Sequence, residues 1–160
     1  MKENTQAKDQ KTAATKFSLQ KIYIKDLSFE SPRPVEALLK PFDRSDVNFQ
    51  IKAENRKLED GVYEVVLRAT VTVSKENSTL YLIEVKQAGL FLLNNFPEPE
   101  LAVMLNVYCP SILYPYAREV VSNMTERGGF PQLLLKPVNF DAIYRQYTEK
   151  GLQEPVPVES

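Results

Sequence analysis

Histidine is absent from the 160 residues of this chain, which also has a single cysteine and only 5 glycines. Without histidine there is no imidazole for general acid–base catalysis, for activating a nucleophile or for binding a metal. One cysteine, Cys109, excludes an intrachain disulfide. It stands between Tyr108 and Pro110 with no base nearby in the sequence, so we interpret it as a small buried hydrophobe.

The sequence motifs of nucleotide and metal sites are missing as well. The chain contains no GxxxxGK[S/T] loop, no GxGxxG, no CxxC and no HExxH. Five carboxylates could in principle pair for acid–base chemistry, but we interpret them as solvated charges: Asp26, Glu30, Glu64, Glu84 and Asp141. The sequence therefore predicts no cofactor, no metal and no enzymatic activity.

Charge and hydropathy argue against two further classes of protein. With 20 basic and 21 acidic residues the net charge is −1, whereas a protein that binds nucleic-acid backbones usually carries a clear basic surplus. No apolar run approaches the ~18 residues that span a bilayer. The first sixteen residues also lack the apolar stretch of a secretory signal. We expect a cytoplasmic protein without nucleic acid as a partner and without membrane insertion.

One domain is predicted between two polar ends. Residues 1–16 are polar and show no periodicity, and residues 151–160 are interrupted by two prolines. Both ends are expected to be disordered or mobile tails. The length of the remaining stretch, residues 17–150, suits a single domain with one core.

The first half of the domain predicts strands. Residues 17–26 alternate and carry apolar residues on both faces. Residues 27–45 form a proline-rich crossing segment in which we expect no sheet strand, although residues 35–40 could form a helical turn. Residues 46–54 alternate strictly, which is typical of a half-buried antiparallel strand. Residues 62–74 and 79–93 then predict a long hairpin after a turn at residues 59–61.

The second half predicts helices. Glu98 and Glu100 suit a first helical turn, and Pro110 is expected to end that helix. A second helix should begin near Ser111 or Pro115 and end at Gly128-Gly129. Asn139 can cap a third, over residues 140–150, with Phe140, Ile143, Tyr144 and Tyr147 on one face. Strands followed by helices predict an α+β fold with the helices on one face of an antiparallel sheet.

Residues 108–147 carry two long motifs that resemble one known family. The first is YCPSILYPYARE, and the second is RGGFPQL followed by PVNFD. Both resemble the signature region of SecB, a family of bacterial export chaperones. The upstream stretches IYIKDLSFESP, DGVYEVVLRATVT and LIEVKQAGLF are similar to the same family. The resemblance covers roughly Phe17 to Tyr147, without the two tails.

The SecB resemblance implies a fold, an activity and partners. The fold would be a four-stranded antiparallel sheet with helices on one face, assembled as a homotetramer that is a dimer of dimers. The activity would be that of an ATP-independent holdase, which binds unfolded precursor proteins and keeps them translocation-competent. The holdase would deliver these precursors to SecA, the translocation ATPase.

Two sets of candidate site residues follow. A groove for unfolded polypeptide is expected between one wall on residues 46–54 and a second wall of aromatic residues, although plain core packing is the alternative for each residue. The groove candidates are Val47, Phe49, Ile51, Tyr116, Phe130, Phe140 and Tyr144. The resemblance also implies SecA-binding residues, on a flat acidic patch that would steer a basic partner. They are Asp26, Glu30, Leu82 and Glu84.

One departure from the family and two alternative functions remain. The C-terminal tail carries only Glu154 and Glu159, where well-known relatives have an acidic tail that helps to contact SecA. The same fold could serve another client as an interaction module, for example a toxin–antitoxin partner. A small-ligand-binding α+β domain is the third class, and it would require a closed pocket.

Overall fold

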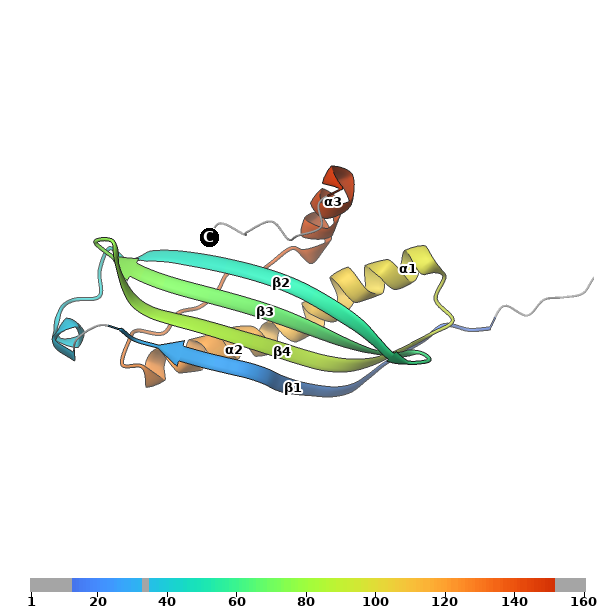
Figure 1. Ribbon diagram of the computed structural model, residues 1–160, viewed down its shortest axis with the longest axis horizontal. Helices are drawn as coiled ribbons and strands as arrows, with labels where there is room; N and C mark the ends of the chain where they lie inside the picture. The colour runs from blue at the N-terminus through green and yellow to red at the C-terminus, as the bar shows by residue number, and fades with distance from the viewer. Residues whose placement is uncertain (1–12, 33–34, 152–160) are drawn as a thin grey trace, which may run out of the picture.

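The computed structural model describes residues 13–32 and 35–151, and Figure 1 shows one curved sheet with helices behind it. The strands are β1 (Lys16–Glu30), β2 (Asp46–Glu59), β3 (Val62–Lys75) and β4 (Ser78–Asn94). A short 3-10 helix, η1 (Val35–Leu39), lies between β1 and β2. The helices that follow the sheet are α1 (Glu98–Val103), the π-helical turn η2 (Met104–Tyr108), α2 (Cys109–Arg127) and α3 (Phe140–Lys150).

The sheet has the order β1-β4-β3-β2, and every neighbouring pair is antiparallel. Tight turns join β2 to β3 and β3 to β4. Gly61 in the first has φ +74°, and Glu76 and Asn77 in the second both have positive φ, as a two-residue hairpin turn requires. The long connection through η1 carries the chain from β1 at one edge to β2 at the other. The predicted four-stranded antiparallel sheet is therefore confirmed.

One face of the sheet forms the core with the helices. Alternate residues of β3, from Val65 to Val73, are fully buried, and α2 packs over β3 and β4. Gly89 in β4 permits a close approach, because an added Cβ would lie 2.7 Å from the Phe91 ring and 3.0 Å from Leu113. The opposite face carries the polar positions of the same strands. Apolar and polar residues thus alternate along the strands, so only one face of the sheet is apolar. The helices pack on that face, as predicted.

Strand β1 is longer than the sequence predicts. It includes residues 27–30, whereas the sequence predicts that the proline-rich segment 27–45 contains no strand. That prediction was wrong because the prolines begin only at Pro32, so the backbone donors of residues 27–30 can pair with β4. The strand also starts at Lys16, inside the expected tail. Residues 1–12 and 152–160 lie outside the described residues.

Pro110 does not end a helix, contrary to the prediction. The chain is helical from Glu98 through Arg127, and the π-helical turn η2 comes just before Pro110. In this wider turn the N–H of Cys109 donates to the carbonyl of Met104, and the Ser111 hydroxyl donates to Val107. A π-helical turn interrupts the regular hydrogen bonds of the helix next to the proline, whose nitrogen has no hydrogen to donate. The expected start of the second helix near Ser111 or Pro115 was therefore late.

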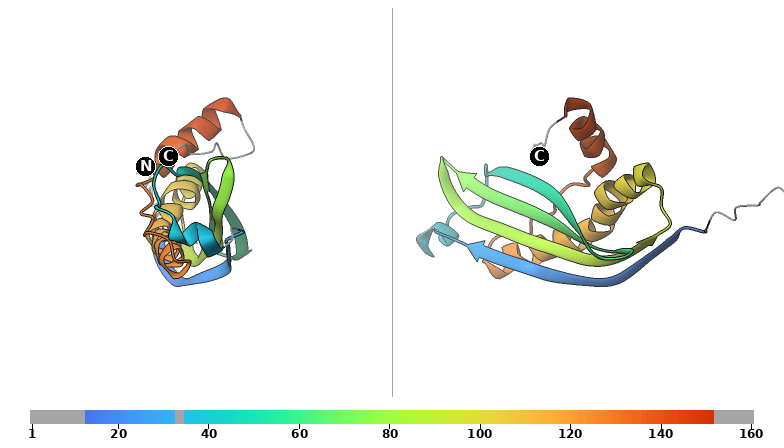
Figure 2. Two further views of the ribbon diagram at one scale, coloured as in Figure 1. Left: turned by 90° about the vertical axis from the view of Figure 1, so that its left-hand side faces the viewer. Right: turned by 45° about the vertical axis from the view of Figure 1, so that its right-hand side comes forward.

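The end of α2 and the start of α3 follow the sequence signals. Gly129 has φ +84°, and the N–H of Phe130 donates to the carbonyl of Thr125 at 3.0 Å. The Asn139 side chain accepts a hydrogen bond from the N–H of Ala142 at 3.0 Å. Helix α3 then stands beside β2, at the sheet edge away from β1 (Figures 1 and 2).

Candidate functional site

A first cavity, of about 380 Å³, lies between β2 and α3. Strand β2 contributes one wall and the predicted apolar face of α3 the other. Its lining residues are Ile51, Lys52, Ala53, Glu54, Asn55, Asn106, Phe140, Ile143, Tyr144 and Tyr147. The side chain of Phe140 is fixed by an edge-on contact with Tyr114, whose ring centroid is 5.9 Å away. This lining combines aliphatic and aromatic side chains with phenol, amide and charged groups.

A second cavity, of about 280 Å³, lies under the crossing segment. Its lining residues are Leu38, Lys40, Pro41, Phe42, Lys75, Leu80, Gly129, Phe130 and Pro131. Behind it the aromatic rings continue into the core, with Phe130 placed 5.8 Å from Phe42 and 4.6 Å from Tyr81. Burial raises the pKa of Tyr81 to about 12, so its phenol stays neutral.

Lys75 fastens the crossing segment beside the second cavity. Its ammonium lies 2.6 Å from the Asp43 carboxylate and donates to the Pro41 carbonyl at 3.0 Å. The hydrogen bond from Lys75, together with its charge, lowers the pKa of Asp43 below its ordinary value. One lysine therefore ties two points of the crossing segment to the end of β3.

The groove candidates are divided among these cavities, the core and the surface. Ile51, Phe140 and Tyr144 meet in the first cavity, and Phe130 lines the second. Phe49 is only 5% exposed and belongs to the core. The remaining two candidates line neither cavity: Val47 packs on the core, and Tyr116 is half-exposed on α2.

Sequence reasoning missed several lining residues. The helical spacing puts Ile143 and Tyr147 on one face with Tyr144, so the sequence carries a signal for both, although they are not among the predicted groove residues. The crossing segment contributes Leu38 and Phe42. No periodic pattern marks residues in an irregular segment, and their position depends on where the chain crosses the end of the sheet.

The four residues predicted to bind SecA lie on the sheet face opposite the helices: Asp26, Glu30, Leu82 and Glu84. In the β1–β4 register Glu30 is opposite Leu82, and Ser28 is opposite Glu84. Residues directly opposite one another in antiparallel strands share a face. Asp26 lies on the same face because it alternates with Ser28 and Glu30 along β1, in a stretch without a register shift. These residues are therefore adjacent on neighbouring strands, and their role in binding SecA stays a prediction.

The face is not uniformly acidic, however. The register places Asp26 opposite Lys86, Lys86 opposite Arg68, and Arg68 opposite Lys52, so a mostly basic row crosses the sheet. Arg68 also lies 3.9 Å from the Glu84 carboxylate. The acidic groups therefore form a corner on β1 and β4 beside this row, which corrects the expectation of a flat acidic patch.

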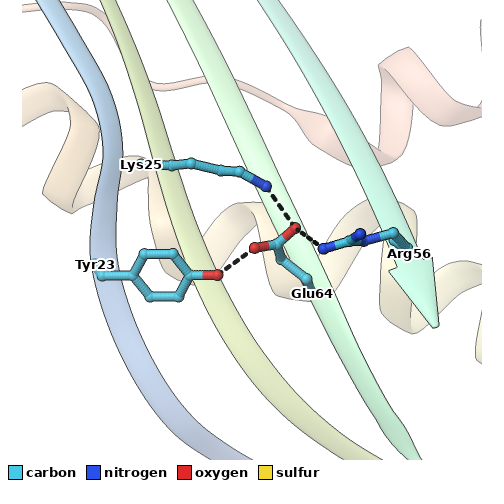
Figure 3. A network of polar contacts seen from close by, with 4 residues as sticks. All are labelled: Tyr23, Lys25, Arg56 and Glu64. Atoms are coloured by element: carbon cyan, nitrogen blue, oxygen red, sulfur yellow. Dashed lines mark hydrogen bonds and ion pairs between the residues drawn. The ribbon is translucent and has the colours of Figure 1, made fainter. Parts of the chain in front are cut away.

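Glu64 forms a polar network that the sequence did not reveal (Figure 3). Its carboxylate accepts hydrogen bonds from the Tyr23 hydroxyl, from Lys25 at 2.8 Å and from Arg56 at 3.4 Å. The prediction that Glu64 is a solvated charge is wrong, because the residue is only 7% exposed. Hydrogen bonds from Lys25 and Tyr23 lower its pKa, while burial and the bond to Glu64 raise the pKa of Tyr23 to about 12. The network ties β1, β2 and β3 together.

The described residues contain neither an exposed thiol nor a cluster of metal ligands. Cys109 is fully buried, and burial raises the pKa of its thiol to about 12, so little thiolate forms at neutral pH. Within residues 13–32 and 35–151 no group of three acidic, cysteine or histidine side chains could hold a metal ion. Over the same ranges no helix is long and apolar enough to cross a membrane.

Comparison with known proteins gives a match to one family. Residues 9–151 match the family described as preprotein translocase subunit SecB. This chain belongs to the SecB family. The protein-export protein SecB of Methylococcus capsulatus is 43% identical over 141 residues, which are 88% of this chain and 90% of that protein. SecB of Nitrosococcus oceani is 45% identical over 148 residues, which are 92% of this chain and 90% of that protein.

A solved structure has the same fold. It is the SecB-like chaperone of Mycobacterium tuberculosis in complex with a peptide from an antitoxin. The TM-score is 0.65 at 18% sequence identity, over 76% of this chain and 90% of that one. Membership of the family makes this chain a protein-export chaperone, as its resemblance to the family implies.

Proposed function

We propose that the chain is an ATP-independent holdase that binds unfolded precursors in the cytoplasm and hands them to SecA, without enzymatic activity of its own. The observation that carries the proposal is the first cavity, where the apolar face of α3 stands beside β2. A cavity of this kind accepts apolar side chains from many sequences. The peptide bound to the Mycobacterium chaperone supports client binding by proteins of this fold.

The free energy that one subunit can gain by binding a client favours several linked sites rather than one tight site. Burying one large apolar side chain contributes about 1.5–3 kcal/mol, and ordering a flexible client offsets much of this. Two modest cavities on one subunit would then hold a client weakly. Linking such cavities in an oligomer raises the overall affinity without new contacts. The proposed homotetramer, a dimer of dimers, supplies that linkage.

Exposed apolar side chains support assembly. On the helix side of β1 four hydrophobic residues are at least one-third exposed, and β1 is an edge strand: they are Phe17, Leu19, Ile24 and Leu27. On the helical layer Tyr108 and Tyr116 are about half-exposed. An apolar edge strand in a monomer is open to pairing with a second copy. Tyr116 therefore fits an assembly surface better than the client groove.

SecA docking is proposed for the opposite face of the sheet. In the acidic corner Glu30 is opposite Leu82, Glu84 is two residues further along β4, and Asp26 lies beyond it on β1, so acidic charge and one apolar side chain are close together. The client cavities lie at β2, α3 and the crossing segment instead. One subunit could thus bind a client and SecA at the same time.

A reciprocal pair of variants tests this separation. Glu84→Lys should weaken SecA binding tenfold or more at low salt, because it reverses a charge in the docking corner. It should leave the affinity for an unfolded precursor unchanged, whereas Tyr144→Ser with Tyr147→Ser should lower client affinity alone. Both affinities can be measured by isothermal titration calorimetry on the oligomer. Equal loss of both ligands in either variant would argue against separate surfaces.

A further inference from the structure

Four charged residues stand in a fixed order across the sheet face opposite the helices. The register places Lys52 of β2 opposite Arg68 of β3, and Arg68 opposite Lys86 of β4. The residue opposite Lys86 on the last strand is Asp26 of β1. Each step crosses one pair of neighbouring strands, so this charge row runs at right angles to the strands. From the β2 edge to the β1 edge its signs are plus, plus, plus and minus.

The cations of the charge row are accessible and only weakly paired within the chain. The side chain of Lys52 is 37% exposed and lies 3.4 Å from Glu54. The side chain of Arg68 is 41% exposed and lies 3.9 Å from Glu84. Ion pairs between exposed groups contribute little free energy, so an incoming carboxylate can replace either partner. Among the residues that the structure describes, none forms an ion pair or a hydrogen bond with the Lys86 ammonium.

The spacing of the charge row matches one side of an α-helix. Neighbouring strands are about 4.8 Å apart, so the four charges span about 14 Å. Helix positions i, i+3, i+7 and i+10 lie on one side, and the last three are about 4.5, 10.5 and 15 Å along the axis from the first. In an extended chain four side chains on one side would span about 20 Å. A helix lying across the strands can therefore place one side chain over each charge.

We infer that this open face of the sheet docks an α-helix of a partner protein whose contact side carries three acidic residues followed by one basic residue. The acidic side chains pair with Lys52, Arg68 and Lys86. The basic side chain pairs with Asp26. The acidic corner alone attracts a basic partner, whereas this helix is mainly acidic. The inference therefore goes beyond the proposed SecA docking and does not rest on it.

The order of the charges favours a helix over an anionic membrane. Asp26, Glu30 and Glu84 lie on the same face as the three cations. A uniformly negative lipid surface, which attracts cations, would press its headgroups against these carboxylates as well. A helix avoids the repulsion, because each of its positions can carry a charge of either sign. The helices of the subunit itself pack on the other face, so they leave room for this contact (Figure 1).

Two helical peptides of identical composition test the order of the charges. Both are held helical by a lactam on the far side, and their contact side reads Glu-Glu-Glu-Lys in one and Glu-Lys-Glu-Glu in the other. Fluorescence anisotropy with the full-length protein at low salt should give about five- to twentyfold tighter binding of the first peptide, because the permutation replaces two attractive pairs by two repulsive ones. Equal affinities, or no binding of the first peptide at millimolar concentration, would overturn the inference.

Charge variants assign the binding to the charge row. Lys86→Gln should weaken the Glu-Glu-Glu-Lys peptide about two- to fivefold. Asp26→Lys should reverse the preference at the last position, so that a peptide with glutamate there binds more tightly than one with lysine. Lys21→Gln is the matched control, since Lys21 is an exposed cation opposite Leu90 and lies outside the row. If Lys21→Gln weakened the peptide as much as Lys86→Gln, only net charge would be at work, and the inference would fail.

Two further measurements separate this partner from a membrane and from SecA. Vesicles of phosphatidylglycerol and phosphatidylcholine should not bind the protein, and vesicle binding that Lys86→Gln abolishes would assign the row to a lipid surface instead. Glu30→Gln, in the acidic corner and outside the row, should weaken SecA binding without changing the affinity for the peptide. Failure of the peptide order would therefore leave the holdase proposal and the SecA surface intact, whereas equal loss of peptide and SecA in Glu30→Gln would contradict a distinct site.

Discussion

Glu64 is the residue at which charge and stability are most closely linked. Its carboxylate is 7% exposed and accepts hydrogen bonds from three side chains on two other strands. Hydrogen bonds to a charged group contribute about 1.5–3 kcal/mol each before solvent exposure of the partners is considered. We predict that Glu64→Gln lowers the free energy of unfolding by about 1–2 kcal/mol in urea at pH 7. The control Glu54→Gln, on an exposed pair, should change it by less than about 0.5 kcal/mol.

The same carboxylate gives a pH dependence with a defined sign. The folded-state pKa of Glu64 lies below the ordinary value of 4.5, which the unfolded chain regains. Its contribution is therefore fully present above about pH 4.5 and is lost as the pH falls through the lower, folded-state pKa. The stability gap between the native chain and Glu64→Gln should shrink on acidification. A gap that is constant across this pH range would contradict the account of the network.

For single residues, the sequence predicts which face of a strand a side chain lies on better than it predicts whether that side chain is buried. Strict alternation placed Phe49 and Ile51 on one face, and the structure agrees. It could not separate groove from core: Phe49 is 5% exposed and Ile51 is 4% exposed, yet Ile51 alone lines a cavity. Which residue reaches a cavity depends on where α3 crosses β2. Phe49→Asp would consequently bury a charge and report on folding rather than on client binding.

Among the elements, α3 is the one whose stability should control a binding site. Asn139 caps it, and the segment before it is held by the Tyr114 hydroxyl, which donates to the Lys136 carbonyl. We predict that Asn139→Ala destabilises α3 by about 1 kcal/mol. Hydrogen exchange followed by mass spectrometry should show faster exchange over residues 140–150 and unchanged exchange in α2.

The matched control for this element is Thr148→Ala. The Thr148 hydroxyl only donates to carbonyls of its own helix, at Tyr144 and Arg145. Its removal should therefore leave both exchange and client affinity unchanged, whereas Asn139→Ala should weaken client binding through the loss of a cavity wall. Faster exchange in α3 without weaker client binding would remove this helix from the proposed site.

Local signals identified nearly every element but misplaced some boundaries. Alternation, turn residues and the Asn139 cap predicted β2, β3, β4 and α3. The helical chain through Pro110 was missed, because proline usually ends a helix and a π-helical turn has no clear sequence signal. The cavities could not be predicted for a similar reason, since they form between elements that are distant in the sequence.

For the whole molecule, we expect the subunits to assemble into a tetramer. Tyr116 is 50% exposed on α2, within the apolar surface that we assign to subunit contacts. We predict that Tyr116→Lys lowers the assembly mass from tetramer to dimer or monomer, because a charge would be placed in an apolar interface. Native mass spectrometry measures this directly. The control Glu119→Lys, on an exposed residue of the same helix, should keep the tetramer, and a tetrameric Tyr116→Lys would contradict the assigned surface.

The most direct test of the account is the binding of one exported precursor to the purified protein, without nucleotide. The precursor would be presented once as an unfolded chain, during dilution from denaturant, and once already folded. The account predicts tight binding of the unfolded chain and none of the folded one, because the two cavities accept apolar side chains that folding buries. Equal binding of both forms, or of neither, would contradict the holdase function.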